Sequence, residues 1–265
     1  MIVNLVFKLT SYISFLYKSK NHHSIHSPFV YNLVTKCIYD NKPKENYDIL
    51  KKYRQSLIQN KKLIHVTDFG AGSKVFKTNK RKISSIAKTA GISKKRAELL
   101  YRITQYFKPK SILEIGSSLG LATFAMAIGN KNANVTGLEG CPETAKHSQL
   151  QLEQFDLENI TILTTEFSDY LSSTEIQSSP EKFDLIYFDG NHTKFATLKF
   201  FELLLTTITN DSIFIFDDIY WSSEMAQAWN IIKKYPKVTV TIDTFQWGIV
   251  FFRTEQAKED FVIRI

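Results

Sequence analysis

Acidic side chains follow two apolar runs late in the chain. Asp189 and His192 follow "FDLIYF", and Asp217 and Asp218 follow "SIFIF". Carboxylates at the ends of apolar strands are costly unless they are paired, hydrogen-bonded or bound to a cation. Three such oxygen ligands with open positions suit Mg²⁺ or another divalent cation, so Asp189, Asp217 and Asp218 are candidate metal ligands. His192 is a candidate general base because its ordinary pKa lies near neutrality; capping the next helix or binding an acid are its alternative roles.

Two glycine-containing stretches are typical of loops that hold a nucleotide-like ligand. They read "DFGAGS" (residues 68–73) and "EIGSSLG" (residues 114–120). In the second, Gly116 permits a tight turn against a ligand, and Gly120 lets the following helix pack closely. One of the three glycines of the dinucleotide fingerprint is missing, which counts against NAD or FAD, and no G-K-[ST] of a P-loop is present.

An acidic residue strengthens the second loop as the ligand site. The run "NVTGLE" ends in Glu139, 23 positions after Gly116. A carboxylate about 20 residues after such a loop accepts hydrogen bonds from both ribose hydroxyls of a nucleoside. The alternative is a charge that stabilises the helix starting at Pro142. Loop and acid together favour a nucleoside-type ligand.

The elements that position these residues change in character near Ser111. Before Lys110 the apolar spacing predicts helices over residues 5–17, 28–39, 47–59, 81–90 and 93–107. From Ser111 onward, short apolar runs alternate with helical stretches, which predicts five βα units and a parallel sheet. The final run "KVTVTIDTFQWGIVFFR" is too short for a crossover, so it predicts an antiparallel β-hairpin.

In this order, the parts from Ser111 to Arg253 resemble the class I S-adenosylmethionine-dependent methyltransferases. The resemblance implies an α/β, Rossmann-like fold with a mostly parallel seven-stranded sheet, a C-terminal antiparallel β-hairpin and here an N-terminal helical extension. It implies that S-adenosylmethionine is the cofactor. Its implied binding residues are Glu114, Gly116, Ser117, Ser118, Gly120, Glu139, Gly140, Glu166, Phe167 and Asp189.

The acids at the fourth and fifth strand ends resemble those of catechol-type and bacterial natural-product O-methyltransferases. In those enzymes a metal held there ionises and orients a substrate hydroxyl, which implies catalytic roles for Asp189, His192 and Asp217. The chain departs from that pattern in two places. It has Asp217-Asp218 where Asp-Asn is usual, and His192 where a lysine is usual. Tyr220 and Trp221 are expected either to line an acceptor pocket or to belong to the core.

The upstream loop is a different case. No strand with a terminal acid follows residues 68–73, so this loop does not begin the parallel sheet. Together with "HSIHSPFVYNLV" and "IFDDIYWSSEMAQAW" it resembles a little-characterised bacterial group of the same methyltransferase class. We expect residues 1–108 to form a helical cap and residues 109–265 the cofactor-binding domain. Residues 68–74 and Arg81 would then lie near the acceptor pocket, or form only a glycine turn between two helices.

Charge and composition bound the partners and the location. Residues 51–110 hold 17 of the 34 Lys and Arg and only two acids, which indicates either an anionic partner such as nucleic acid or a solvated surface. The apolar N-terminal 20 residues carry no signal-peptide features and predict an amphipathic helix that packs on the body, on a partner subunit in a homodimer, or on a membrane surface. Two separated cysteines favour the cytoplasm. The expected function is O-methylation of a small-molecule or glycan-type acceptor; the alternatives are an RNA methyltransferase and a non-catalytic binding or membrane-associated module.

Overall fold

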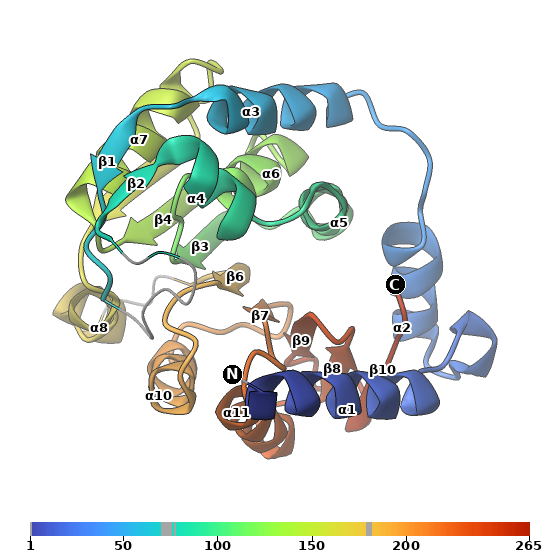
Figure 1. The fold of residues 1–265 in the computed structure, drawn as a ribbon. Coiled ribbons are helices and arrows are strands. Elements are labelled where there is room, and N and C mark those ends of the chain that lie inside the picture. The colour runs from blue at the N-terminus through green and yellow to red at the C-terminus, as the bar shows by residue number, and fades with distance from the viewer. Residues whose placement is uncertain (1, 70–75, 77, 179–181) are drawn as a thin grey trace. The chain divides into compact units, whose positions relative to one another are not determined.

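The computed structural model in Figure 1 describes residues 2–69, 76, 78–178 and 182–265. The chain divides into two compact units, and each is described by itself. The central unit is Asp40–Tyr170, and the terminal unit combines Met1–Tyr39 with Leu171–Ile265. The predicted division of the sequence into residues 1–108 and 109–265 stays a prediction.

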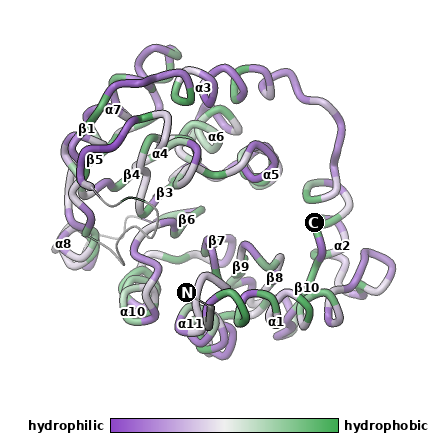
Figure 2. The backbone as a smooth tube through the Cα atoms, viewed as in Figure 1, coloured by the Kyte–Doolittle hydropathy of each residue, from purple (hydrophilic) through white to green (hydrophobic). Residues whose placement is uncertain are grey.

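Three parallel strands form the sheet of the central unit. They are β3 (Ser111–Ile115), β4 (Asn134–Glu139) and β5 (Ile160–Thr164), and β4 pairs with both of the others. The helices α6 (Leu121–Gly129) and α7 (Pro142–Glu153) connect them, as the alternating pattern predicts. Every residue of α6 from Leu121 to Ile128 is buried, and Figure 2 shows this helix largely in the hydrophobic colour. A helix apolar on all sides belongs in a core, so α6 anchors the loop that precedes it.

The upstream part of the central unit contains the helices α3 (Tyr47–Gln59), α4 (Ile83–Thr89) and α5 (Lys94–Phe107), close to their predicted bounds. Ser93 caps α5 by accepting a hydrogen bond from the N–H of Arg96. One expectation is wrong here. The strands β1 (Leu63–His65) and β2 (Lys80–Lys82) pair antiparallel, so the predicted loop falls between two strands and not between two helices, and its residues 70–74 lie outside the described part of the chain. These three-residue strands carry too little apolar pattern to be recognised.

The terminal unit contains five strands in the order β10-β8-β9-β7-β6. Their bounds are β6 (Leu185–Phe188), β7 (Ile213–Asp217), β8 (Val240–Asp243), β9 (Trp247–Phe251) and β10 (Glu259–Val262). The pair β6–β7 is parallel, and β8–β9 is the predicted antiparallel hairpin. Apart from β1 and β2, the described residues contribute three sheet strands in the central unit and five in the terminal unit. These eight strands are one more than the predicted seven. The added strand is β10, a mostly exposed edge strand with two acidic residues that pairs parallel with β8.

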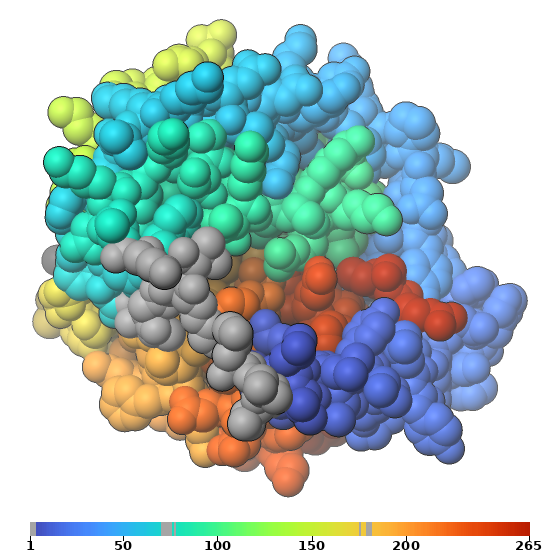
Figure 3. Space-filling model, in the orientation of Figure 1, coloured from blue at the N-terminus to red at the C-terminus, as the bar shows by residue number. Residues whose placement is uncertain are grey.

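Helices from both ends of the sequence complete the terminal unit. The early ones are α1 (Ile2–Lys18), the 3-10 turn η1 (His22–Ser24), α2 (Pro28–Leu33) and the π-helical turn η2 (Val34–Ile38). The later ones are α9 (Thr174–Ser178), α10 (Lys194–Leu204) and α11 (Ser223–Lys234), whereas the short α8 (Phe167–Leu171) belongs to the central unit up to Tyr170. In Figure 3, α1 (dark blue) lies at the surface beside the C-terminal segment in red. A bridge between Lys20 and Ile263 ties these ends together.

Gly248 on β9 supplies a stability prediction. A Cβ at this position would lie within 2.8 Å of three ring atoms of Trp229, which is buried and has no room to move. We expect Gly248→Ala to lower the free energy of unfolding by about 1–3 kcal/mol, as overpacking of a core does. Urea denaturation measures the change, with Lys237→Ala at an exposed loop position as the control. Equal midpoints for Gly248→Ala and the wild type would contradict the packing described.

Candidate functional site

The loop after β3 turns back onto the end of β4. The N–H groups of Gly116 and Ser117 both donate to the carbonyl oxygen of Leu138, at 3.0 and 2.9 Å. Gly116 has a φ of 94°, in the region that side-chain-bearing residues rarely adopt. A glycine is therefore needed where the sequence pattern places the tight turn.

Glu139 is held by this loop and by the residue that precedes α7. The N–H of Ser118 donates to its Oε2 at 2.9 Å, and the N–H of Cys141 donates to its Oε1 at 2.8 Å. Burial raises the pKa of Glu139, and the bonds from Cys141 and Ser118 oppose that rise by favouring the carboxylate. The glycine loop and the acid that the sequence singles out separately are thus joined by a direct hydrogen bond.

Gly120 serves close packing. A Cβ there would lie 2.7 Å from Ser148 Oγ and 2.8 Å from the hydroxyl of Tyr53, and its φ is 73°. Tyr53 comes from α3, is buried, and donates to the carbonyl oxygen of Leu119 at 2.8 Å. It also stacks on Phe124 with ring centroids 4.2 Å apart. A helix far upstream in sequence therefore supports the loop.

Glu114 lies at the end of β3 with its side chain fully buried. The hydroxyl of Thr123 donates to its Oε2, whereas Oε1 has no hydrogen-bond partner among the described residues. Burial raises its pKa to about 8; the bond from Thr123 lowers the pKa, and the charge of Glu139 raises it further. An unpaired buried carboxyl oxygen is costly. Glu114 is therefore suited to a hydrogen-bonding or cationic ligand.

A second unpartnered polar group lies nearby in sequence. The Oγ of Ser117 is buried and has no partner in the described part of the chain. Gly137 faces this serine, since a Cβ there would lie 3.0 Å from Ser117 Cβ. The candidate adenine residues follow β5: Glu166 is exposed and Phe167 is half-buried. The N–H of Thr165 donates to the carbonyl oxygen of Glu139 at 3.1 Å, which brings this segment beside the ribose candidate.

In the terminal unit, His192 lies beside Asp189 after β6. Its Nε2 is 3.6 Å from Asp189 Oδ1, and both side chains are mostly buried. The cap of α10 is Thr193, whose hydroxyl accepts from the N–H of Ala196. His192 is therefore not the helix cap, and its imidazole faces the Asp189 carboxyl group.

The predicted metal ligands follow β6 and β7. Asp217 is buried, and Asp218 has a φ of 51° in the left-handed region. Across the described ranges, no group of three or more His, Cys, Asp or Glu is placed to hold a metal ion. The residues as they stand do not fit the expected site. We therefore route no chemical step through a metal, and the ligand set Asp189, Asp217 and Asp218 stays a prediction.

Aromatic side chains follow the acid pair. The hydroxyl of Tyr220 donates to Asp243 Oδ2 at 2.7 Å, and its ring stacks on Phe245 at 5.0 Å. Asp243 also accepts from the indole N–H of Trp229 and the N–H of Phe245, although burial raises its pKa. This buried carboxylate fixes the hairpin loop between β8 and β9 against Tyr220.

The helix α1 covers this aromatic group. Tyr12 meets Phe245 edge to face at 4.9 Å between centroids. Lys8 places its Nζ 3.9 Å from the centre of the Trp221 ring, and that ring lies 6.4 Å from His192. The first helix of the chain and the residues after β7 thus form one surface around the candidate base, which favours a lining role for Trp221.

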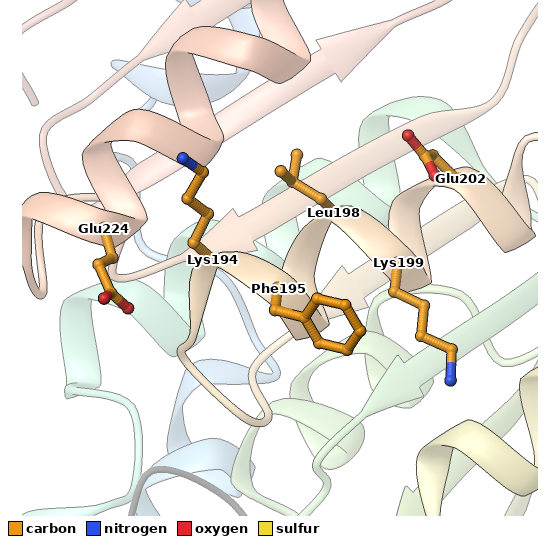
Figure 4. Close-up of a pocket in the computed structure, with 6 residues that line it drawn as sticks. All are labelled: Lys194, Phe195, Leu198, Lys199, Glu202 and Glu224. Carbon is orange, nitrogen blue, oxygen red and sulfur yellow. The ribbon is translucent and has the colours of Figure 1, made fainter.

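Figure 4 shows a surface hollow of about 500 Å³ between α10 and the start of α11. Its lining residues are Lys194, Phe195, Leu198, Lys199, Glu202 and Glu224. None of them belongs to the predicted site, and two lysines offset two glutamates. The hollow has no feature that selects a nucleoside or an anion.

Several contributing residues have no signal in the sequence. Tyr53, Thr123 and Asp243 act through contacts with residues at least 9 positions away, and each belongs to a type common elsewhere in the chain. The periodicity of apolar residues indicates which face of a helix or strand a residue occupies. It does not identify the residue that it contacts elsewhere in the chain.

Comparisons with known proteins agree with this architecture. Residues 113–219 match the family model described as a methyltransferase domain. An S-adenosylhomocysteine-bound methyltransferase from Podospora anserina, PaMTH1, is 13% identical, with 86% of this chain and 97% of that chain covered and a TM-score of 0.59. The O-methyltransferase TomG from Streptomyces achromogenes, in complex with S-adenosylmethionine, is 12% identical over 84% of this chain and 95% of that chain, with a TM-score of 0.57. An O-methyltransferase from Bacillus cereus is 16% identical over 83% and 94%, with a TM-score of 0.56.

At these identities the solved structures bear on the fold, and the family model bears on residues 113–219. The solved structures agree with the predicted Rossmann-like class of fold, and the elements of this chain include its mostly parallel strands, its C-terminal antiparallel hairpin and the N-terminal helices. The chain therefore has the Rossmann-like fold of these methyltransferases, and its residues 113–219 match the model of a methyltransferase domain.

Proposed function

We propose that this protein transfers a methyl group from S-adenosylmethionine to an oxygen atom of a small-molecule or glycan-type acceptor. The observation that carries the proposal is the hydrogen bond from Ser118 N–H to Glu139 Oε2, which joins the glycine loop to the candidate ribose acid. The matched methyltransferase domain spans both elements. The solved structures of PaMTH1, the Bacillus cereus enzyme and TomG contain S-adenosylhomocysteine or S-adenosylmethionine, which supports the same cofactor here.

The cofactor residues follow from the geometry of the central unit. Glu139 would accept the ribose hydroxyls, since a carboxylate offers about four lone-pair sites and the backbone N–H groups of Ser118, Cys141 and Gly140 do not fill them. Glu114 and Ser117 supply buried polar atoms that need a partner, and the methionine ammonium offers N–H donors. When bound, S-adenosylmethionine supplies an electrophilic sulfonium methyl, so the protein's tasks are alignment and proton removal.

Proton removal is assigned to His192. Its Nδ1 would take the proton of the acceptor hydroxyl, because Nε2 faces the Asp189 carboxylate, which would stabilise the imidazolium that forms. Trp221 lies beside the His192 ring, Lys8 lies over Trp221, and both would contact the acceptor. Asp217 remains a catalytic candidate, but we assign it neither a proton-transfer step nor a bound ligand.

The RNA alternative has less support. Within the basic segment, Arg54 donates to the carbonyl oxygen of Ile92, Arg102 donates to the hydroxyl of Tyr47, and Arg81 pairs with Asp68. These arginines hold the unit together, which leaves fewer cations for phosphates. Binding to RNA that weakens steeply with salt would favour this alternative over a small acceptor.

Peripheral membrane contact through α1 and a homodimer are further proposals. The helix leaves Leu5, Leu9 and Ile13 exposed along one face, although Tyr12 and Phe15 pack on the body of the unit. None of the helices in the described chain is both long and apolar enough to cross a bilayer. Sedimentation with anionic vesicles would decide whether lipid or protein is the partner of the exposed face of α1. We also propose a cytoplasmic location for the protein.

The first test of the proposal is cofactor binding. We expect the wild type to bind S-adenosylmethionine in a calorimeter, and Glu139→Ala to weaken binding at least 10-fold because the ribose loses a charged acceptor. Glu158→Ala, at an exposed acid of the same unit, is the matched control. A wild type that binds no cofactor would refute the function, and a Glu139→Ala variant with unchanged affinity would refute the ribose role.

Glu114 yields a pH prediction. Its folded pKa of about 8 exceeds the ordinary 4.5, so the folded state holds a proton that the unfolded state releases between these values. Stability from this group is complete below pH 4.5 and is lost as pH rises toward 8. Glu114→Gln is neutral throughout. From pH 5 to 8.5 the wild type should lose on the order of a few kcal/mol relative to the variant. Parallel pH profiles of the two unfolding free energies would contradict this account.

The role of His192 is tested once an acceptor has been found by screening with labelled cofactor. We expect His192→Gln to lower kcat by about 10²–10⁴-fold while cofactor affinity is unchanged, as for loss of a general base. Asp189→Asn should lower kcat less, because the imidazole remains. His23→Gln, at an exposed histidine of the terminal unit, is the control. A His192→Gln enzyme with wild-type kcat would remove the base assignment.

A further inference from the structure

The β1–β2 hairpin is anchored on the residues that follow Glu139. The N–H of His65 donates to Glu143 Oε2 at 2.6 Å. The thiol of Cys141 donates to the carbonyl oxygen of His65 and accepts from the N–H of Thr67, both at 3.4 Å. All of these residues belong to the central unit. The first strand of the hairpin is thereby fixed at the end of β4 and the start of α7.

This anchoring brings Phe69 onto Gly140. A Cβ at Gly140 would lie 2.9 Å from the nearest atom of the Phe69 ring, so ring and backbone are in contact. Phe69 is 49% exposed, an unusual state for a large apolar side chain that is held in place. The ring therefore covers the residue next to the ribose candidate and keeps an open face.

Asp68 directly precedes Phe69 and is paired with a cation of the same hairpin. Its charge is near enough to raise the pKa of the Glu139 carboxyl. Arg81 on β2 holds Asp68 in place: its guanidinium lies 3.5 Å from Asp68 Oδ2, and its Nε donates to the carbonyl oxygen of Thr78. The same guanidinium lies over the ring of Phe76 at 4.8 Å. Both strands of the hairpin thus position Asp68.

We propose that Asp68 and Phe69 form a wall of the adenosine site, with Phe69 contacting the nucleoside face and Asp68 accepting from the ribose side. This inference rests on the proposed function. A nucleoside presents hydroxyls and a flat apolar ring, and proteins meet these with carboxylates and aromatic side chains. Glu139 supplies only the first of these. The hairpin supplies a second carboxylate and an aromatic face beside Gly140, in addition to the candidate Phe167 that follows β5.

The experiment compares affinities for adenosine and for S-adenosylhomocysteine by calorimetry. Phe69→Ala should weaken both ligands by the same factor, about 10-fold, because the wall touches only the nucleoside. Phe69→Leu should fall between, since it keeps bulk without an aromatic face. Glu114→Gln provides the contrast: it should weaken S-adenosylhomocysteine and leave adenosine unchanged. Leu63→Ala, an exposed apolar residue of the same hairpin, is the control and should match the wild type.

Gly140→Ala tests the same contact from the other side. Its backbone is not in the left-handed region, so alanine is tolerated there, but the new methyl displaces the Phe69 ring. We expect Gly140→Ala to lower the affinity for adenosine in the wild-type background and to have little further effect in the Phe69→Ala background. The effects of the two substitutions would then be non-additive. Asp68→Asn should weaken adenosine a few-fold.

The outcomes separate the two levels of inference. If the wild type binds neither ligand, the proposed function fails. If the wild type binds and Glu139→Ala weakens binding, while Phe69→Ala and Gly140→Ala match the wild type, the function stands and the wall is overturned. Tighter binding by Phe69→Ala would also overturn it, because the ring would then be an obstruction.

Discussion

The carboxylate of Glu139 is the interaction on which the central unit's site depends. It accepts backbone N–H groups from Ser118 in the glycine loop and from Cys141 before α7, so one side chain fixes both segments. Charge-assisted bonds of this kind are stronger than neutral ones and define geometry well. The same residue lies next to Gly140, onto which the upstream hairpin packs. Loop, helix start and hairpin are thus located relative to one acid.

The terminal unit is organised by a comparable group. Asp243 accepts bonds from Tyr220, Trp229 and Phe245, which belong to three separate segments. Through Tyr12 the first helix joins the same aromatic assembly. A buried carboxylate satisfied by three donors is costly to disturb, because removal of a donor leaves charge without compensation. Each unit therefore places an ionisable group where its chain segments converge.

Much of the fold could be predicted because the signals are local. Most parallel strands are apolar runs, five helices (α2, α5, α7, α10 and α11) begin at Ser, Thr or Pro, and the short gap after Asp243 forces a hairpin. The loop and acid of the cofactor site follow from spacing. The strands β1, β2 and β10 could not be predicted, since each has three or four residues with mixed polarity and gains its structure from pairing. Contacts such as Phe69 on Gly140 or Tyr53 on Leu119 join residues more than 60 positions apart, and no single-sequence pattern encodes them.

The position of Tyr53 has a consequence for how fragments of this protein would behave. Its hydroxyl closes on the Leu119 carbonyl, and only the bare glycine at position 120 leaves room for it. A fragment beginning at Ser111 would keep every residue of the glycine-loop motif, yet it would lose the support that Tyr53 gives to the loop. Such a fragment would contain the complete nucleoside-binding motif in sequence but would lack a rigidly held glycine loop. The recognisable motif and the functional unit are therefore of different lengths in this chain.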